Sequence, residues 1–326
     1  MQTIIKKVYL APMEGVADAP MREVLTKVGG YDECFSEFIR VTDDVLPYKT
    51  LLRDVPELSN DAKTKSGTNV RVQFLGDNKE TLAMSAKRAI ELGAKSIDMN
   101  FGCPSRFVHH GGAMLLKEPE LLHDIVASLI DAISGKAHLS IKIRSGFSNK
   151  DEAPNIVKAI AQDGVDEIII HARTRKDLYK EDALDWSLIK DLHSLSNNIN
   201  IVANGDICSF DDGQRCAGQS LCDRLMIGRA ALMIPNIGHV IKENAKVFSS
   251  AQTLHTVYEF AETLISHGQH DKAVMDRCKQ FLGFGRKNNK VLTDFFKIFC
   301  KMVVLKDAML ALSSMEKALK DNGIEN

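Results

Sequence analysis

Cys103 is a candidate catalytic residue because of its position in the sequence. It lies in a Gly-Cys-Pro turn directly after residues 96 to 102, an apolar run typical of a β-strand. A thiol at a strand end can exchange a proton with a bound substrate, although most cysteines are small buried hydrophobic residues. No base is adjacent, and a thiol near its reference pKa of about 8.5 can serve as a general acid at neutral pH. We therefore expect Cys103 to be catalytic, as a proton donor.

Polar residues and glycines also occupy the ends of the other apolar runs. They are Pro12, Met13, Glu14, Gln73, Asn100, Lys142, Arg144, His171, Asn204, Gly205, Asp206, Gly228 and Arg229. Barrel packing alone would favour Val, Ile and Leu at such positions. In a (β/α)8 barrel the active site forms where the strands end, so these residues are candidates for ligand contacts.

Two of these residues carry a more specific expectation. Lys142 alternates with Ile141 and Ile143, so it points away from the strand face that the isoleucines occupy. A buried lysine needs an anion or an electron-rich ring beside it, and a cofactor would supply one. His171 could be an ordinary core histidine, but its place at a strand end favours a ligand contact.

Two glycine-bearing segments, residues 204–206 and 228–229, end the last two runs. Loops after the seventh and eighth strands of such barrels often bind phosphate through backbone N–H groups, and glycine lets the backbone approach the ligand closely. Arg229 would add charge-assisted hydrogen bonds. The alternative is a glycine turn beside a solvated arginine, but the two segments together favour a phosphorylated ligand.

A repeated βα arrangement must position these residues. Short β-branched runs at 7–13, 33–39, 69–76, 96–102, 139–146, 167–174, 200–207 and 224–232 alternate with amphipathic segments such as 78–93 and 118–133. Eight strands close a (β/α)8 TIM barrel, which is an α/β fold. A doubly wound open sheet would also explain the alternation, but it usually carries a glycine-rich fingerprint after its first strand, where this chain has APMEG.

Strand patterns stop after about residue 242, and the remaining segments have helical periodicity. We therefore expect a catalytic barrel domain at 1–242 and a C-terminal all-helical domain at 243–326. The segment 271–307 holds nine basic and four acidic residues. Such a charge run is often only a solvated helical face, but it could also follow a phosphate backbone.

The overall composition is that of an ordinary globular protein. Of 326 residues, 44% are hydrophobic and 26% are charged, and the net charge of −1 by itself predicts no affinity for nucleic acid. The seven cysteines are scattered and form no C-x-x-C pair, which argues against disulfides and zinc. Because we find neither a secretory signal nor a membrane span, we expect a cytoplasmic protein. Nothing calls for an obligate protein partner, so we expect a monomer.

The chain resembles the tRNA-dihydrouridine synthases over essentially its whole length. APMEGV, VQFLG, DMNFGCPS, IKIRSG, HART, NGDI and MIGRAAL occur in the order seen in that family, and EGVADAPMREVLT and RCKQFL are most similar to the bacterial subfamily acting on uridine 16 of the D-loop. The resemblance implies an FMN-binding barrel, NADPH as reductant and tRNA as substrate. A flipped-out uracil would receive hydride at C6 and a proton from Cys103 at C5.

The resemblance also assigns the other site residues. FMN contacts should fall on Pro12, Met13, Glu14, Gln73, Lys142, His171, Asn204, Gly205, Asp206, Gly228 and Arg229, and tRNA contacts on Arg40, Asn100, Arg144, Arg277 and Lys279. The sequence departs from the subfamily after the cysteine, where FVHHGGAMLL is shorter than expected and carries His109 and His110. Paired histidines could suggest a metal, but no second ligand cluster accompanies them.

Two other functions remain open from the sequence. A flavin barrel acting on a free pyrimidine, similar to dihydroorotate dehydrogenase, would share the cofactor and the active-site acid, but it has no need for the basic helical segment. A tRNA-binding protein that has lost catalysis would keep that segment, but the polar residues at the strand ends argue against such a loss.

Overall fold

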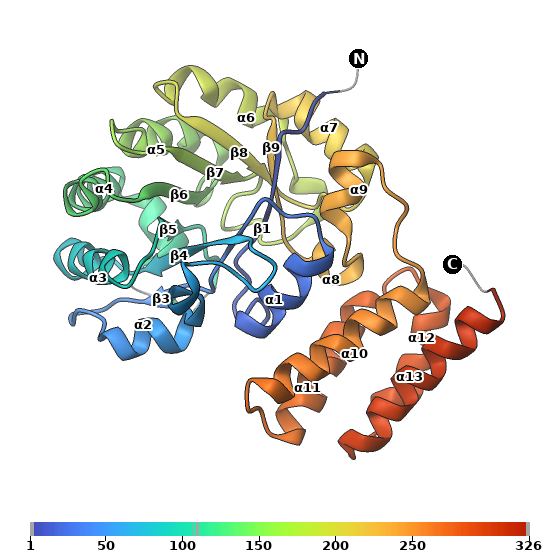
Figure 1. Ribbon diagram of the computed structural model, residues 1–326. Coiled ribbons are helices and arrows are strands. Elements are labelled where there is room, and N and C mark those ends of the chain that lie inside the picture. Colours follow the sequence, from blue (N-terminus) through green and yellow to red (C-terminus); the bar gives the residue numbers. More distant parts are fainter. Residues whose placement is uncertain (1–2, 106, 109–110, 324–326) are drawn as a thin grey trace.

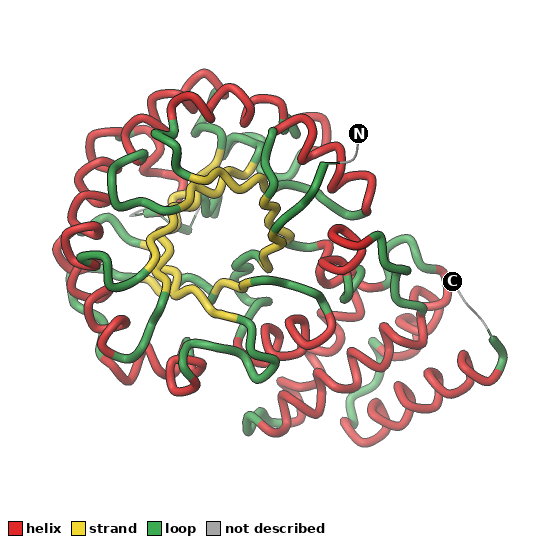
Figure 2. Tube along the Cα trace, turned by 45° about the horizontal axis from the view of Figure 1, so that its top comes forward, coloured by secondary structure: helices red, strands yellow, loops and turns green. Residues whose placement is uncertain are grey.

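Eight parallel strands close into a barrel in the computed structural model, which describes residues 3–105, 107–108 and 111–323 (Figure 1). The strands are β1 (Lys7–Leu10), β2 (Glu33–Phe35), β4 (Asn69–Leu75), β5 (Ser96–Phe101), β6 (His138–Arg144), β7 (Glu167–His171), β8 (Asn200–Asn204) and β9 (Arg224–Ile227). β1 pairs with β2 and β9, and β2 pairs with β4, so the sheet has no open edge. Figure 2 shows this ring of strands inside a ring of helices. The predicted barrel is confirmed, and a doubly wound open sheet is excluded.

Strand alternation separates two kinds of buried side chain. Ile141 and Ile143 face outward into the large core between strands and helices, whereas Ile169 and Val202 belong to a second cluster inside the barrel. Arg71 lies near the opening at the N-terminal ends of the strands, where the guanidinium contacts two carboxylates at 2.7 Å. Ion pairing lets this charge stay buried. The opposite end of the barrel is therefore free to hold a ligand.

Helices follow most of the strands. They are α1 (Ala19–Val28), α2 (Tyr48–Asp54), α3 (Lys79–Glu91), α4 (Pro119–Ile133), α5 (Ala153–Ile160), α6 (Ser187–Leu192), α7 (Phe210–Ser220), α8 (Ala230–Met233) and α9 (Ile237–Glu243). The segments predicted at 78–93 and 118–133 are α3 and α4. Asn78 caps α3 by accepting a hydrogen bond from the N–H of Thr81, and Gly93 follows its end with φ +101°. Short 3-10 turns occupy Pro56–Asn60, Gly112–Lys117, Lys150–Glu152, Glu181–Ala183 and His193–Leu195.

The second predicted strand, 33–39, is interrupted. β2 ends at Phe35 and β3 (Ile39–Arg40) continues along the same neighbour, β4. Three residues separate β2 from β3, but only two separate their partners on β4, so one extra residue forms a bulge. There the hydroxyl of Ser36 accepts the hydrogen bond of the Gln73 N–H, which replaces a rung of the ladder.

Several strands end earlier than their apolar runs predicted. The runs 7–13, 200–207 and 224–232 give strands that stop at Leu10, Asn204 and Ile227. At each place the chain reaches the rim of the barrel and continues as a loop. The residues expected at strand ends therefore lie in these loops as well as on the strands.

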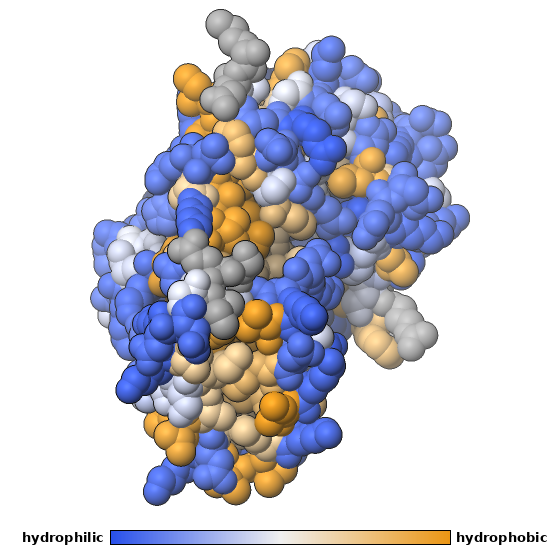
Figure 3. All heavy atoms as spheres, turned by 90° about the vertical axis from the view of Figure 1, so that its right-hand side faces the viewer, coloured by the Kyte–Doolittle hydropathy of each residue, from blue (hydrophilic) through white to orange (hydrophobic). Residues whose placement is uncertain are grey.

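Four helices follow residues 244–249: α10 (Ser250–Ser266), α11 (Asp271–Gly285), α12 (Lys290–Phe299) and α13 (Leu305–Asp321). α10 packs against α11 and α13, and the group contacts the barrel through α1 and α8. The Lys27 ammonium pairs with the Glu259 carboxylate at 2.7 Å across this contact. Figure 3 shows apolar residues gathered among polar ones over the lower half of this side of the molecule. None of the helices described here is both long enough and apolar enough to cross a membrane.

Candidate active site

A cavity of about 1620 Å³ opens where the strands end. Every residue predicted to contact the cofactor lines it: Pro12, Met13, Glu14, Gln73, Lys142, His171, Asn204, Gly205, Asp206, Gly228 and Arg229. Cys103, Asn100 and Arg144 line it as well. Phe284, at the end of α11, and Lys287, just after that helix, line it too, so the wall is made by barrel loops and the C-terminal helical segment together.

The turn that carries Cys103 is held by side chains from the barrel interior. The carbonyl oxygen of the Asn100 side chain accepts hydrogen bonds from the N–H groups of Gly102 and Cys103, each at 2.9 Å. The Arg144 guanidinium donates to the carbonyl oxygen of Gly102 at 3.0 Å. Beyond the turn, the N–H of Ala113 donates to the carbonyl oxygen of Cys103 at 3.0 Å. Both sides of the turn are therefore fixed.

The environment of the Cys103 thiol keeps it protonated. Burial raises its pKa above the ordinary value, and the nearby Glu14 carboxylate acts in the same direction, while Arg144 and Lys142 oppose the shift. A thiol of this kind holds its proton at neutral pH, so it has the protonation state that a general acid requires and not that of a thiolate nucleophile.

Lys142 is a buried cation in the wall of the cavity. Its ammonium donates to the side-chain oxygen of Asn204 at 3.3 Å. Burial and the repulsion of Arg144 lower its pKa from 10.5 to about 8, against the attraction of Asp98 and Cys103. Among the described residues it makes this one hydrogen bond, so the ammonium is short of partners there for its three donors.

His171 and Arg173 present buried polar atoms to the same cavity. The Nδ1 atom of His171 and one terminal nitrogen of Arg173 have no hydrogen-bond partner in the described part of the chain. Burial and four surrounding arginine and lysine side chains lower the pKa of His171 well below its ordinary value, so the imidazole is neutral. Buried polar atoms without partners are costly, and a ligand that fills the cavity would satisfy them.

The loops after β8 and β9 meet through a shared carboxylate. Asp206 contacts Arg173 and Arg229, each at 2.6 Å. Burial would raise the pKa of Asp206, but these two ion pairs hold it below the ordinary value. Gly205 has φ +134°, and the indole N–H of Trp186 donates to its carbonyl oxygen at 3.0 Å. Glycine is needed here because an added Cβ would lie 2.9 Å from Leu184.

Tyr179 is a component of the site that the sequence analysis missed. Its ring lies under the guanidinium groups of Arg229 and Arg144, at 4.5 and 5.3 Å, and meets His171 edge-on. It belongs to the irregular loop between β7 and α6, which has no period to place it. An aromatic residue eight positions after the histidine was the only available signal.

The residues predicted to contact tRNA are divided between two places. Asn100 and Arg144 line the cavity, whereas Arg40, exposed at the end of β3, does not. Arg277 and Lys279 lie on α11, also outside the cavity lining. The ammonium of Lys279 donates to the carbonyl oxygen of Met302 at 2.7 Å.

Arg277 reaches from α11 to the loop after β1. Its guanidinium donates to the carbonyl oxygens of Gly15 and Val16 at 2.6 and 2.7 Å and contacts the Asp18 carboxylate at 2.9 Å. This loop also carries Met13 and Glu14 of the cavity wall. The C-terminal helices are therefore connected directly to the site.

His109 and His110 lie outside the described residues, so the metal considered for them stays untested. All seven cysteines are free thiols. Within the described ranges, no three His, Cys, Asp or Glu side chains are grouped as metal ligands.

The donor set fits the flavin implied by the sequence resemblance. Lys142 and the unpartnered atoms of His171 and Arg173 offer hydrogen bonds to an electron-rich ring system. The loops at 204–206 and 228–229 offer backbone N–H groups and Arg229 to a phosphate. The cavity is also large enough to admit a substrate ring beside such a cofactor.

A (β/α)8 barrel with a protonated thiol, a lysine short of partners and a phosphate-type cradle at its strand ends has the architecture of a barrel oxidoreductase. The chain belongs to the dihydrouridine synthase family: the family profile "Dihydrouridine synthase (Dus)" matches residues 9–323.

Curated relatives agree with this assignment, and two solved structures share the fold. The tRNA-dihydrouridine(16) synthase of Pasteurella multocida is 43% identical, with 86% of this chain and 90% of that protein covered. Those of Haemophilus influenzae and Escherichia coli K12 are 41% and 39% identical, covering 91% and 89% of this chain and 94% and 92% of theirs. Histamine dehydrogenase from Rhizobium sp. 4-9 shares the fold, with a TM-score of 0.55 and 13% identity over 79% of this chain and 49% of its own. A 2-naphthoyl-CoA reductase complex gives 0.57 and 12%, over 73% and 50%.

Proposed function

We propose that this protein is a tRNA-dihydrouridine synthase that reduces uridine 16 of the D-loop to 5,6-dihydrouridine, with FMN as bound cofactor and NADPH as reductant. The observation that carries the proposal is the protonated Cys103 thiol, fixed in its turn on the same cavity as the Lys142 ammonium and the Asp206–Arg229 pair. The choice of uridine 16 rests on the names of the relatives.

The FMN would be held by the residues that line the cavity. We assign Lys142 and His171 to the ring system and the Gly205 and Gly228 loops, with Arg229, to the phosphate. Pro12, Met13, Glu14, Gln73, Asn204 and Asp206 complete the proposed wall. When bound, the flavin supplies the hydride for C6 of the uracil ring.

Cys103 then supplies the proton that C5 requires. Its raised pKa keeps the proton on sulfur until the ring becomes basic. Asn100 fixes the backbone of the turn, and Arg144 holds both Gly102 and the loop after β7 through the carbonyl oxygens of Thr174 and Leu178. These contacts orient the thiol toward the cavity and limit its movement.

Substrate size distinguishes the proposal from a flavin barrel acting on a free pyrimidine. We propose that residues 1–242 form the catalytic domain and residues 243–326 a helical domain that helps to bind tRNA. Lys287, at the cavity rim, supports this arrangement because it places a positive charge between the helices and the barrel mouth. Arg40 would extend the contact surface from β3. Arg277 and Lys279 belong to the same proposed surface, although their head groups are bound within the chain.

We also propose that the enzyme acts as a monomer in the cytoplasm, where tRNA is modified. The C-terminal helices of the same chain complete the cavity wall through Phe284 and Lys287, so a second copy is not needed to build the site.

The proposal is tested by following NADPH oxidation with unmodified tRNA, free uracil and orotate in parallel. We expect turnover with tRNA alone. Turnover with free orotate would favour the pyrimidine oxidoreductase, and tight tRNA binding without turnover would favour the inactive binding protein. Cys103→Ala should keep flavin and tRNA binding but lose most product formation, by about 10²-fold or more. Full activity in this variant would contradict the role of the thiol.

A further inference from the structure

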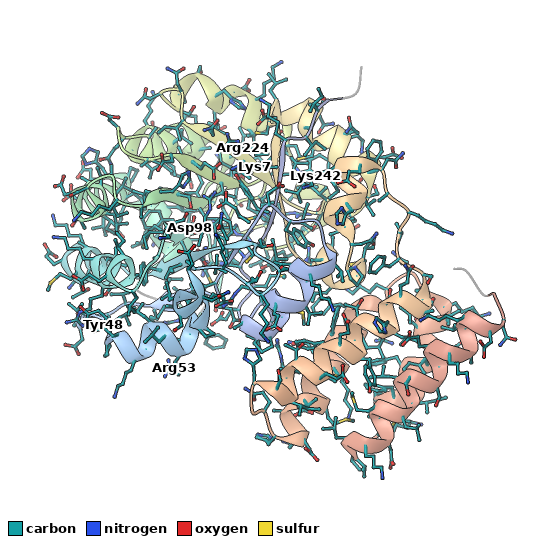
Figure 4. All side chains as sticks on the ribbon, viewed as in Figure 1. Lys7, Tyr48, Arg53, Asp98, Arg224 and Lys242 are labelled. Carbon is teal, nitrogen blue, oxygen red and sulfur yellow. The ribbon has the colours of Figure 1, made fainter. Side chains whose placement is uncertain are left out.

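A chain of side-chain hydrogen bonds runs inside the barrel from Asp98 to the turn of Cys103. The Gln73 amide donates to the Asp98 carboxylate at 2.6 Å, and the Asn100 amide donates to the side-chain oxygen of Gln73 at 2.8 Å. The side-chain oxygen of Asn100 then accepts the N–H groups of Gly102 and Cys103. Asp98 and Gln73 are fully buried, and Figure 4 shows Asp98 within the ring of strands.

The direction of every hydrogen bond in this chain is determined by its two ends. An ionised carboxylate only accepts, so it orients the NH₂ group of Gln73 toward Asp98. The oxygen of Gln73 must then face the NH₂ group of Asn100, which leaves the oxygen of Asn100 for the turn. The backbone N–H groups at the turn only donate, so they require the same orientation. Both ends agree, and neither amide can flip without losing at least two hydrogen bonds.

Among the groups in this series of hydrogen bonds, the Asp98 carboxylate alone does not line the cavity. Gln73 and Asn100 line the cavity, but Asp98 does not. It lies one layer deeper, where the Ser140 hydroxyl donates to its other oxygen at 2.5 Å. A buried charge at this depth is expensive, and elsewhere in the barrel interior apolar residues such as Ile169 and Val202 occupy such positions. Its retention there needs a reason beyond packing.

We propose that Asp98 is a positioning residue of the proposed reaction, which orients the amides of Gln73 and Asn100 and through them holds the Cys103 turn in place. The effect on the reaction rests on the proposed function, whereas the effect on the position of the Cys103 turn does not. Removing the carboxylate frees the Gln73 amide to rotate, weakens the contact of Asn100 with the turn and lets the thiol move. The Lys142 ammonium lines the same cavity, but it donates to Asn204 and takes no part in this series of hydrogen bonds.

Thiol alkylation in the absence of tRNA tests the geometry. Wild type, Asp98→Ala, Asp98→Asn and Ser140→Ala are treated with iodoacetamide, and the labelled peptides are quantified by mass spectrometry. In Asp98→Ala we expect alkylation of Cys103 to accelerate several-fold, because a loosened turn exposes the thiol and relieves its burial. Cys208 lines the same cavity but takes no part in this series of hydrogen bonds. Its alkylation rate is therefore the internal control and should not change.

The other variants separate orientation from mere packing. Asp98→Asn retains an acceptor oxygen for Gln73 and should stay close to wild type, which also guards against misfolding of the alanine variant. Ser140→Ala removes another hydrogen bond to the Asp98 carboxylate, one that does not lead to the Cys103 turn. This variant should leave the alkylation rate of Cys103 unchanged. Equal effects of Asp98→Ala and Ser140→Ala, or an unchanged Cys103 rate in Asp98→Ala, would overturn the proposal.

Kinetics then connect the geometry to the reaction. In Asp98→Ala we expect tRNA-dependent turnover to fall about tenfold, the loss expected for one hydrogen bond to a charged group. The KM for tRNA should stay nearly unchanged, because Asp98 contacts no substrate. A rise in KM with unchanged kcat would contradict a positioning role. If wild type itself lacks tRNA turnover, the proposed function fails, while the alkylation rates still decide the inference about Asp98.

Discussion

Flavin affinity should depend on pH through Lys142. Burial and Arg144 lower the pKa of this ammonium from 10.5 to about 8 in the free protein. A shift of this size means that the site disfavours the charged form of Lys142 by about 3 kcal/mol, since one pKa unit corresponds to about 1.4 kcal/mol. An electron-rich flavin ring beside the ammonium would offset much of this cost by attraction.

The sign of the effect follows from proton binding. With flavin bound, the pKa of Lys142 rises, so above pH 8 the complex holds more protons than the free protein. Flavin binding therefore weakens as pH increases beyond about 8, by at most about tenfold in Kd for each pH unit. Below pH 8 both states are protonated, and the affinity should be constant.

The assay is titration of the apoprotein with FMN, followed by quenching of flavin fluorescence between pH 7 and pH 9.5. This range avoids the phosphate ionisation near pH 6. Lys142→Met, which keeps a long side chain without charge, should bind more weakly at pH 7 and show no slope. Lys176→Met removes an exposed lysine of the same cavity and serves as the control. A flat wild-type profile, or a slope that survives in Lys142→Met, would refute the reasoning.

Three further predictions concern the supports of the site. Gly205→Ala should lower the free energy of unfolding by about 1–3 kcal/mol in chemical denaturation, because φ +134° and the approach to Leu184 both oppose a Cβ; an unchanged midpoint would contradict the strain. Arg277→Ala should weaken FMN binding more than Lys27→Ala, since Arg277 contacts the loop after β1 and Lys27 does not, and equal affinities would argue against that coupling. Burial raises the pKa of Asp98 from 3.8 to about 6, so the wild-type fold loses stability as the pH rises from about 4 to about 6 and the loss is complete above that; Asp98→Asn should be more stable than wild type by about 2–3 kcal/mol at pH 8, and the gain should vanish below pH 4.

The sequence predicted the barrel and the polar residues of the cavity wall that lie at strand ends, because both depend on local periodicity. Lys142 alternates with isoleucines, and a residue that alternates at a strand end must face either the helices or the mouth of the barrel. Gly205 and Gly228 lie after the last two strands, where the fold itself builds a phosphate site. No long-range information was needed for these residues.

The remaining features depend on contacts between distant segments. The bulge after Phe35 is defined by its register with β4, and Tyr179 lies on an irregular loop under arginines from two other strand ends. The role of Asp98 appears only when β4 and β5 bring it beside Gln73. Likewise, the position of Arg277 depends on how α11 docks beside the barrel. From its charge alone we predicted a contact with tRNA, whereas its guanidinium donates to the carbonyl oxygen of Gly15.

The most direct test of the account is to map dihydrouridine in tRNA before and after reaction with the purified protein. Unmodified tRNA is incubated with the FMN-loaded protein and NADPH, and the positions are read by mass spectrometry of nuclease fragments. We expect a mass gain of two hydrogens at uridine 16, dependent on NADPH and lost in Cys103→Ala. Dihydrouridine at a different position would contradict the assigned specificity, and its absence from tRNA that the protein binds would contradict the reaction itself.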